Sequence, residues 1–300
     1  MPPAAPRRRL CRMPELAEER TFTDAHGVTV FYDVRPAEGT PRGVVQLLHG
    51  VGEHAGRYGA LIDALAADGF TVYADDHRGH GRTGMAQHGG NARKLGRLGV
   101  GGMPATLAAC RQLTDIVRAD NPDLPLIVIG HSWGSFLTQM LVDDRPEAYD
   151  AFVLSGSALR WPGTLNSGDL NAPWKKPGAN GAEWLSSDPD VGTAFLADPL
   201  TTSEPLVKLF GLIDAARLLG RPRRNLERDL PALLMVGQDD TVGGPRSVHK
   251  LADAYRARSG LTDVTTLVYP GARHEIFNET MQADVRADLL AWLDARFPRR

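Results

Sequence analysis

The sequence is poor in cysteine, in net charge and in long apolar runs. Its 300 residues contain two cysteines, Cys11 and Cys110, and carry a formal net charge of −2. Two cysteines do not make a disulfide framework, so we expect a reducing compartment and a cytoplasmic location. The small net charge offers no general attraction to nucleic acid. Because no run of about 18 apolar residues occurs, we also expect no stable insertion into a membrane.

The first 20 residues lack the apolar segment that a secretory signal requires. Three consecutive arginines at positions 7–9 and a fourth at position 12 suggest a targeting segment, but no apolar stretch follows them. We therefore interpret residues 1–20 as a disordered basic tail. An export signal is the alternative interpretation.

The rest of the chain can form a sizeable core, because 42% of the sequence is hydrophobic. Apolar segments with the character of strands, such as residues 27–35, 42–49 and 70–75, alternate with helical patterns. Gly39 and Pro41 mark a hairpin-like turn between the first two of these strands. The alternation predicts an α/β fold with a mostly parallel, doubly wound sheet flanked by helices. Ligands of such sheets bind at the carboxyl ends of the strands.

The strand pattern is lost in residues 157–228, where glycine, proline and asparagine are frequent and aromatic residues are interspersed. We interpret this segment as a helical or irregular cap, inserted into a core domain of residues 21–156 and 229–300. The aromatic residues of the cap are candidates for substrate contact, among them Trp161, Trp184 and Phe195. The alternative is a small satellite core with no role in ligand binding.

The segment around Ser132 is the one around which the chain is organised. A run of apolar residues leads into Gly-His-Ser-Trp-Gly at positions 130–134, and an apolar helical pattern follows at once. This is a strand, a sharp turn and a helix with a serine at the apex, the context that a G-x-S-x-G nucleophile requires. We expect the strand and the helix nearly to touch at Gly130 and Gly134. The alternative is an ordinary turn between a strand and a helix.

A serine hydroxyl is a weak nucleophile and needs a base that takes its proton. Of the nine histidines, His274 follows the last predicted strand, and Asp240 follows the strand before it. Imidazole can accept a proton near neutral pH, and a carboxylate fixes its tautomer. We therefore predict Ser132 as nucleophile, His274 as base and Asp240 as acid. Asp239 is the competing acid, and turn capping is the alternative role for each residue.

Two backbone N–H groups are candidates for an oxyanion hole. The amide of Trp133 lies at a predicted helix N-terminus, where unpaired N–H groups favour negative charge. The loop of residues 49–54 contains two glycines, which let the backbone approach a ligand closely. We predict the amide of Val51 as the second donor. The alternative is an ordinary loop between a strand and a helix.

The loop of residues 76–82 contains His77 and His80, a pair that invites a metal-binding interpretation. We expect no metal and no cofactor, because the flanking ligands are not at a zinc spacing and no cysteine is near. The charged residues of the loop are expected to fix it by hydrogen bonds.

Several segments together resemble the monoacylglycerol lipase and lysophospholipase branch of the α/β-hydrolases, which is of the serine aminopeptidase S33 type. They are LLHGVGEHAGRY (residues 47–58), DDHRGHGRT (75–83), IGHSWGS (129–135), WLSSDP (184–189) with ADPL (197–200), VGQDDTVGG (236–244) and YPGARHEIFNE (269–279). The resemblance implies the α/β-hydrolase fold, with the catalytic and oxyanion-hole residues assigned above. It also implies that Glu53 and Arg57 lie on the polar side of the site, where the leaving group binds.

The sequence departs from the family pattern at two positions beside the nucleophile. Trp133 stands where the family often has methionine, and its large ring is expected to narrow the acyl pocket. Ser135 replaces a second glycine, but its neighbours lack the nucleophile pattern, so we do not expect it to react. The predicted cap resembles the family only in its second half.

The leading hypothesis is a serine hydrolase that cleaves the carboxylic ester of a lipid with one acyl chain, through an acyl-enzyme. The aromatic cap supports an acyl substrate, because burial stabilises each CH₂ group by roughly 0.8 kcal/mol. The same triad serves a peptidase, an amidase or a thioesterase, and a binding protein without catalysis is a third reading. The expected partner is a small lipid-like ester, with transient contact between the cap and a membrane surface. The oligomeric state is not indicated.

Overall fold

The computed structural model describes residues 17–166 and 168–299, and it contains one eight-stranded sheet. The strands are β1 (Glu18–Thr23), β2 (Thr29–Arg35), β3 (Gly43–Leu48), β4 (Phe70–Asp75), β5 (Leu126–His131), β6 (Ala151–Ser155), β7 (Ala232–Gly237) and β8 (Val264–Tyr269). Their spatial order is β1-β2-β4-β3-β5-β6-β7-β8. β2 runs antiparallel to its neighbours β1 and β4, and the other neighbouring pairs are parallel. The predicted mostly parallel sheet is confirmed.

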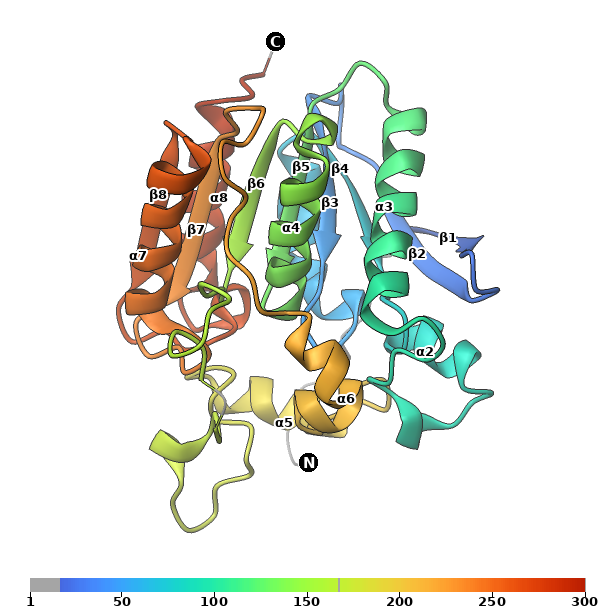
Figure 1. The fold of residues 1–300 in the computed structure, drawn as a ribbon, viewed down its shortest axis with the longest axis vertical. Helices are drawn as coiled ribbons and strands as arrows, with labels where there is room; N and C mark the ends of the chain where they lie inside the picture. The colour runs from blue at the N-terminus through green and yellow to red at the C-terminus, as the bar shows by residue number, and fades with distance from the viewer. Residues whose placement is uncertain (1–16, 167, 300) are drawn as a thin grey trace, which may run out of the picture.

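Helices cover both faces of this sheet. They are α1 (Gly59–Ala67), α2 (Gly81–Gln87), α3 (Gly102–Asp120), α4 (Trp133–Asp144), α5 (Pro189–Ala197), α6 (Leu206–Ala216), α7 (Gly244–Ala254) and α8 (Gln282–Asp294). α3, α4 and α7 pack on one face, and α1 and α8 pack on the other (Figure 1). Within β3, Val44 and Leu48 belong to the first core, whereas Val45 and Leu47 belong to the second. Burial on both faces explains why the central strands are continuously apolar.

Two expectations for the N-terminal part were wrong. Residues 18–20, assigned to the tail, begin β1 and pair with β2. β1 is a largely exposed edge strand with polar residues, so it lacks the apolar signal of a core strand. Gly39 and Pro41 do not close a hairpin, because β4 lies between β2 and β3. Residues 1–16 of the expected tail lie outside the described residues.

The described residues between β6 and β7 contribute no strand to the sheet, and they include the helices α5 and α6. Figure 1 shows both helices beyond the carboxyl ends of the parallel strands. Ala182, Leu185 and Phe195 form a small core within this segment, whereas Leu209 and Phe210 of α6 join a main core. Among the described residues, no helix combines the length and the apolar character needed to cross a membrane.

Candidate active site

Ser132 lies at the turn between β5 and α4, with a φ of 52° and a ψ of −121°. A side chain at Gly130 would overlap Thr138 and the carbonyl of Gly134, and a side chain at Gly134 would overlap the carbonyl of Leu48. Gly130 therefore marks the closest approach of β5 and α4, and Gly134 marks the closest approach of α4 and the end of β3. The packed elements on either side hold the strained backbone of the serine. The strand, turn and helix predicted around the serine are all present.

His274 lies in the loop after β8, and Asp240 lies in the loop after β7. The Nδ1 atom of His274 and the Oδ2 atom of Asp240 are 3.0 Å apart, and both side chains are buried. The other oxygen of Asp240 accepts the backbone N–H of Val242 at 2.7 Å. Asp239, the competing acid, is exposed. Donation from Nδ1 to the carboxylate leaves Nε2 of His274 as the proton acceptor.

Nε2 of His274 is buried and has no hydrogen-bond partner within the described part of the chain. The ring of His131, the residue before Ser132, lies 4.7 Å from the ring of His274 between centroids, which places the base beside the turn that carries the serine. Proton transfer requires the hydroxyl and Nε2 to come within about 3.2 Å of each other. The free lone pair of Nε2 is available for that step.

The pKa values of the neighbouring residues His274 and His131 are shifted in opposite directions. Burial disfavours the charged form of His274, but the attraction and hydrogen bond of Asp240 outweigh it and raise the pKa of His274. The negative charges of Glu275 and Glu53 act in the same direction. Burial, followed by repulsion from His274, lowers the pKa of His131 to about 3. Of these two residues, His274 is therefore the one whose protonated form its surroundings favour.

The two predicted oxyanion donors are unoccupied by protein acceptors. Neither the backbone N–H of Val51 nor that of Trp133 donates a hydrogen bond to another described residue. Trp133 is the first residue of α4, where an N–H has no acceptor within its own helix and favours negative charge. The loop that carries Val51 is anchored on both sides. Gly50 donates to Glu53 at 2.6 Å, and the carbonyl of Gly52 accepts the N–H of Thr202 at 2.8 Å.

The side chains beside the nucleophile are packed rather than free. The indole of Trp133 is buried, and its ring lies 5.0 Å from that of Phe210 in α6 and 4.9 Å from that of His80 between centroids. The indole thus fills space between α4 and the inserted segment. The hydroxyl of Ser135 donates to the carbonyl of Ser132 at 2.5 Å, and it is also engaged in a second hydrogen bond.

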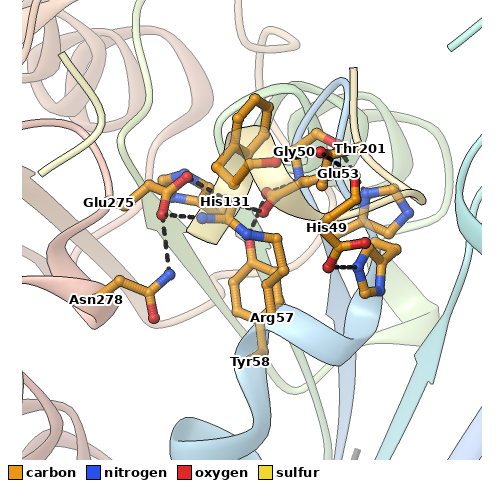
Figure 2. A network of polar contacts seen from close by, with 12 residues as sticks. His49, Gly50, Glu53, Arg57, Tyr58, His131, Thr201, Glu275 and Asn278 are labelled. Carbon is orange, nitrogen blue, oxygen red and sulfur yellow. Dashed lines mark hydrogen bonds and ion pairs between the residues drawn. The ribbon is translucent and has the colours of Figure 1, made fainter. Parts of the chain in front are cut away.

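Glu53 and Arg57 form a buried ionic network beside the site (Figure 2). Oε1 of Glu53 accepts the N–H of Gly50 and the hydroxyl of Tyr58, both at 2.6 Å. Oε2 accepts Nη1 of Arg57 at 2.5 Å. The guanidinium of Arg57 also pairs with both oxygens of Glu275, at 2.6 and 2.7 Å. Glu53 and Arg57, which were predicted to contact the leaving group, therefore form hydrogen bonds with other residues of the protein.

The three aromatic candidates of the inserted segment differ in position. The ring of Trp184 lies 5.0 Å from that of the predicted base between centroids. Phe195 is buried, with the guanidinium of Arg57 4.9 Å from its ring centroid. Trp161 is 42% exposed and stacks with Arg221 at 3.7 Å. The structure brings Trp184 and Phe195 to the site, but among the described aromatic contacts none joins Trp161 to a catalytic residue.

The loop of residues 76–82 is held by hydrogen bonds, among them one from the backbone N–H of Arg82 to Asp76 at 2.9 Å. The expectation that no cysteine lies near this loop was wrong, because Sγ of Cys110 in α3 lies 4.0 Å from Nδ1 of His77. His77 also contacts Asp75 at 2.7 Å. Burial opposes its charge, but Asp75 and Cys110 outweigh burial and raise the pKa of His77 to about 10. A metal ligand must be deprotonated, so we interpret this group as a buried ion pair.

Sequence reasoning missed the acidic partner of Arg57. Glu275 was visible as a charged residue directly after the predicted base, but nothing local in the sequence links it to Arg57, 218 positions away. Tyr58 and Asn278, which bond to Glu53 and Glu275, were missed for the same reason.

A comparison with protein families matches residues 39–281 to the family described as serine aminopeptidase, S33. The chain belongs to this family. It is similar to a monoacylglycerol lipase of Mycolicibacterium smegmatis, at 34% identity over 92% of this chain and 96% of the relative. It is also similar to a monoglyceride lipase of Mus musculus, at 27% identity over 99% and 97%. A solved structure of a thermostable carboxyl esterase from Bacillus coagulans matches at 25% identity with a TM-score of 0.77, over 95% of this chain and 100% of that one. The predicted α/β-hydrolase fold is confirmed.

The close contact at the nucleophile turn predicts a large cost for a small substitution. In Gly134→Ala, the new methyl group would overlap the carbonyl of Leu48 and push β3 and α4 apart. We expect the free energy of unfolding to fall by about 1–3 kcal/mol in chemical denaturation. The matched control is Gly168→Ala, whose methyl group would meet only the exposed side chain of Asn166, and its stability should stay within about 0.5 kcal/mol of the parent. Equal stability of the two variants would contradict the packing argument.

The raised pKa of His274 predicts the acid limb of the activity profile. The base acts only when neutral, and Asp240 makes its proton harder to remove. The value of kcat/KM should therefore fall with decreasing pH around a midpoint above the usual histidine value of about 6.5. Asp240→Asn should lower kcat by about 10⁴-fold, as expected when the imidazole loses its orienting carboxylate. Asp239→Asn is the control and should change neither quantity; a loss in that variant instead would reassign the acid.

Proposed function

We propose that this protein is a serine hydrolase that cleaves the ester bond of a monoacylglycerol or a similar lipid with one acyl chain. The observation that carries the proposal is the hydrogen-bonded pair of His274 and Asp240 next to the strained turn of Ser132. Relatives along nearly the whole chain are named monoacylglycerol or monoglyceride lipase. The likeness to these relatives supports carboxylic ester hydrolysis over other uses of the same triad.

The proposed reaction proceeds through an acyl-enzyme. Oγ of Ser132 attacks the ester carbonyl carbon while Nε2 of His274 takes the hydroxyl proton. The N–H groups of Val51 and Trp133 stabilise the negative oxygen of the tetrahedral intermediate. The alcohol then leaves with the proton from His274, and the acyl group stays on Ser132. A water molecule gives a proton to His274 and attacks the acyl carbon. The bond from that carbon to Oγ of Ser132 then breaks, His274 returns the proton to Oγ, and the fatty acid is released, while Asp240 stabilises the imidazolium in both halves. No cofactor or metal is required by these steps.

The aromatic residues near the base define the proposed contacts with the substrate. We assign Trp184 and Phe195 to the site, because their rings lie against His274 and Arg57. Apolar surface there stabilises a bound lipid by roughly 0.8 kcal/mol for each CH₂ group buried. We do not assign Trp161 to the substrate site, because its ring stacks with the guanidinium of Arg221 and is otherwise exposed.

An aminopeptidase would need carboxylates in the inserted segment that are free to bind a substrate amine. Glu183 accepts backbone N–H groups within its own turn, and Asp188 caps the N-terminus of α5. Asp198 pairs with His54 at 3.1 Å. These carboxylates are occupied by roles in local structure. We therefore favour the ester over the peptide substrate.

The decisive assay compares 4-nitrophenyl esters of increasing acyl length with aminoacyl 4-nitroanilides. The protein should hydrolyse the esters, whereas Ser132→Ala should lose at least about 10³-fold in kcat and all labelling by a fluorophosphonate probe, because the nucleophile is gone. Ser135→Ala is the matched control and should still be labelled at Ser132. Hydrolysis retained by Ser132→Ala would exclude the assigned nucleophile, and faster cleavage of the anilides would establish the peptidase instead.

We also infer that α6 makes transient contact with a lipid surface. Leu212 and Ile213 of α6 are 78% and 72% exposed, which leaves two adjacent apolar side chains in solvent. Lys208 and Arg217 flank them, but each pairs with a carboxylate, Glu204 and Asp214, so the exposed apolar pair is the feature that suits a lipid surface. Such contact would bring the site to a substrate dissolved in lipid. From this surface and from the scarcity of cysteine, we propose that the protein is cytoplasmic and that it contacts the cytoplasmic side of a membrane.

The contact with lipid is tested by sedimentation with vesicles of phosphatidylcholine and phosphatidylglycerol. The double variant Leu212→Ser/Ile213→Ser should lower the bound fraction several-fold, because the exposed apolar surface of α6 is lost. Its kcat on soluble 4-nitrophenyl acetate should remain that of the parent. Val100→Ser removes an equally exposed apolar side chain, 77% accessible, outside the inserted segment. If this control reduces vesicle binding as much as the double variant does, α6 is not the contact.

A further inference from the structure

A buried cluster of one arginine and two glutamates joins two loops of the site. Arg57 lies between Glu53 and Glu275, and Figure 2 shows the guanidinium with a carboxylate on either side. Nη1 donates to Glu53 at 2.5 Å and to Glu275 at 2.6 Å, while Nη2 donates to the second oxygen of Glu275 at 2.7 Å. The side chains are 3–4% exposed. Two parallel bonds to Glu275 fix both the distance and the orientation of that carboxylate.

Each glutamate of the cluster is tied to one of the groups that act on the substrate. Glu53 accepts the N–H of Gly50 at 2.6 Å, and the next residue, Val51, carries the proposed oxyanion donor. Glu275 directly follows His274, the proposed base. The guanidinium therefore connects the loop after β3 to the loop after β8. Its bonds set the separation of the amide and the imidazole.

The cluster has little capacity left to bind a leaving group. Glu53 accepts three donors, the third being the hydroxyl of Tyr58 at 2.6 Å. Glu275 accepts a further hydrogen bond from Asn278 at 3.0 Å. The ring of Phe195 covers Arg57, and the Nε atom of that arginine, which lacks a partner among the described residues, is buried. A substrate alcohol would have to displace existing bonds to reach any of these groups.

We propose that Glu53, Arg57 and Glu275 are positioning residues that hold the Val51 amide and the His274 imidazole in one geometry, and that they do not bind the leaving group. This inference rests on the proposed ester hydrolysis. The cluster carries one more negative than positive charge. It faces an imidazole that also meets Asp240 and His131, so loss of one carboxylate charge weakens the hold of His274 on its proton.

The test uses the isosteric variants Glu53→Gln and Glu275→Gln and two esters with the same acyl chain, a monoacylglycerol and a 4-nitrophenyl ester. We expect kcat to fall by roughly 10- to 100-fold on both esters, because a displaced loop misaligns the reacting groups regardless of the alcohol. KM should change by less than about threefold, because these residues make no contact with the bound substrate in this proposal. The acid limb of kcat/KM should move to lower pH. Arg57→Lys, which keeps the charge but cannot bridge two carboxylates, should lower kcat on both esters as well.

The matched control is Asp33→Asn, which removes the charge of another buried carboxylate: Asp33 lies on β2 and pairs with Arg82 of α2. It should lower stability without changing kcat or the pH profile. A higher KM for the monoacylglycerol alone would overturn the proposal in favour of leaving-group binding, and variants that lose only stability would overturn it in favour of a purely structural role. Absence of fluorophosphonate labelling at Ser132 in the parent protein would instead reject the proposed function itself.

Discussion

The strained backbone of Ser132 depends on the tight contact between β5 and α4. Its φ of 52° is sterically costly for a residue with a side chain, and it persists because β5 is buried on both faces. Gly130 allows β5 and α4 to approach closely enough to hold the turn, and Gly134 allows α4 to approach the end of β3. The same turn leaves the first N–H of α4 without an intrahelical acceptor. The packing around this turn thus positions both the proposed nucleophile and the first proposed donor for the oxyanion.

The order of the parallel strands brings the remaining groups to this turn from two sides. β5 lies between β3 and β6, and β7 and β8 follow further along the sheet. The loop after β3 carries the Val51 amide on one side, while the loops after β7 and β8 carry Asp240 and His274 on the other. Because none of these three loops is a strand or an α-helix where it carries its group, each needs its own hydrogen bonds to hold that group in place. The hydrogen bond to Asp240 orients the imidazole, and the carboxylate of Glu53 orients the amide loop.

The parts that could be predicted from the sequence are those with a local signature. Ser132, Asp240 and His274 each follow an apolar strand in a loop of turn-forming residues, and the order of the three along the chain narrows the chemistry. The pairing of Arg57 with Glu275 has no such signature, because two exposed-looking charges 218 positions apart resemble solvated residues. The proximity of Cys110 to His77 was hidden in the same way. β1 was missed because an edge strand need not be apolar.

The cost of the buried arginine cluster bears on its role. Removing three charged groups from water costs several kcal/mol for each ion before their attraction is counted, and well-packed apolar residues in place of such clusters are often equally stable or more so. Net stability is therefore a weak explanation for the cluster. Apolar side chains, however, cannot accept a hydrogen bond from the N–H of Gly50. A compact cation such as an ammonium group cannot donate two parallel hydrogen bonds to the two oxygens of Glu275. A planar guanidinium between two carboxylates can do both, because its donors are fixed in one plane. The direction of the bonds, more than their energy, accounts for burying charge at this position.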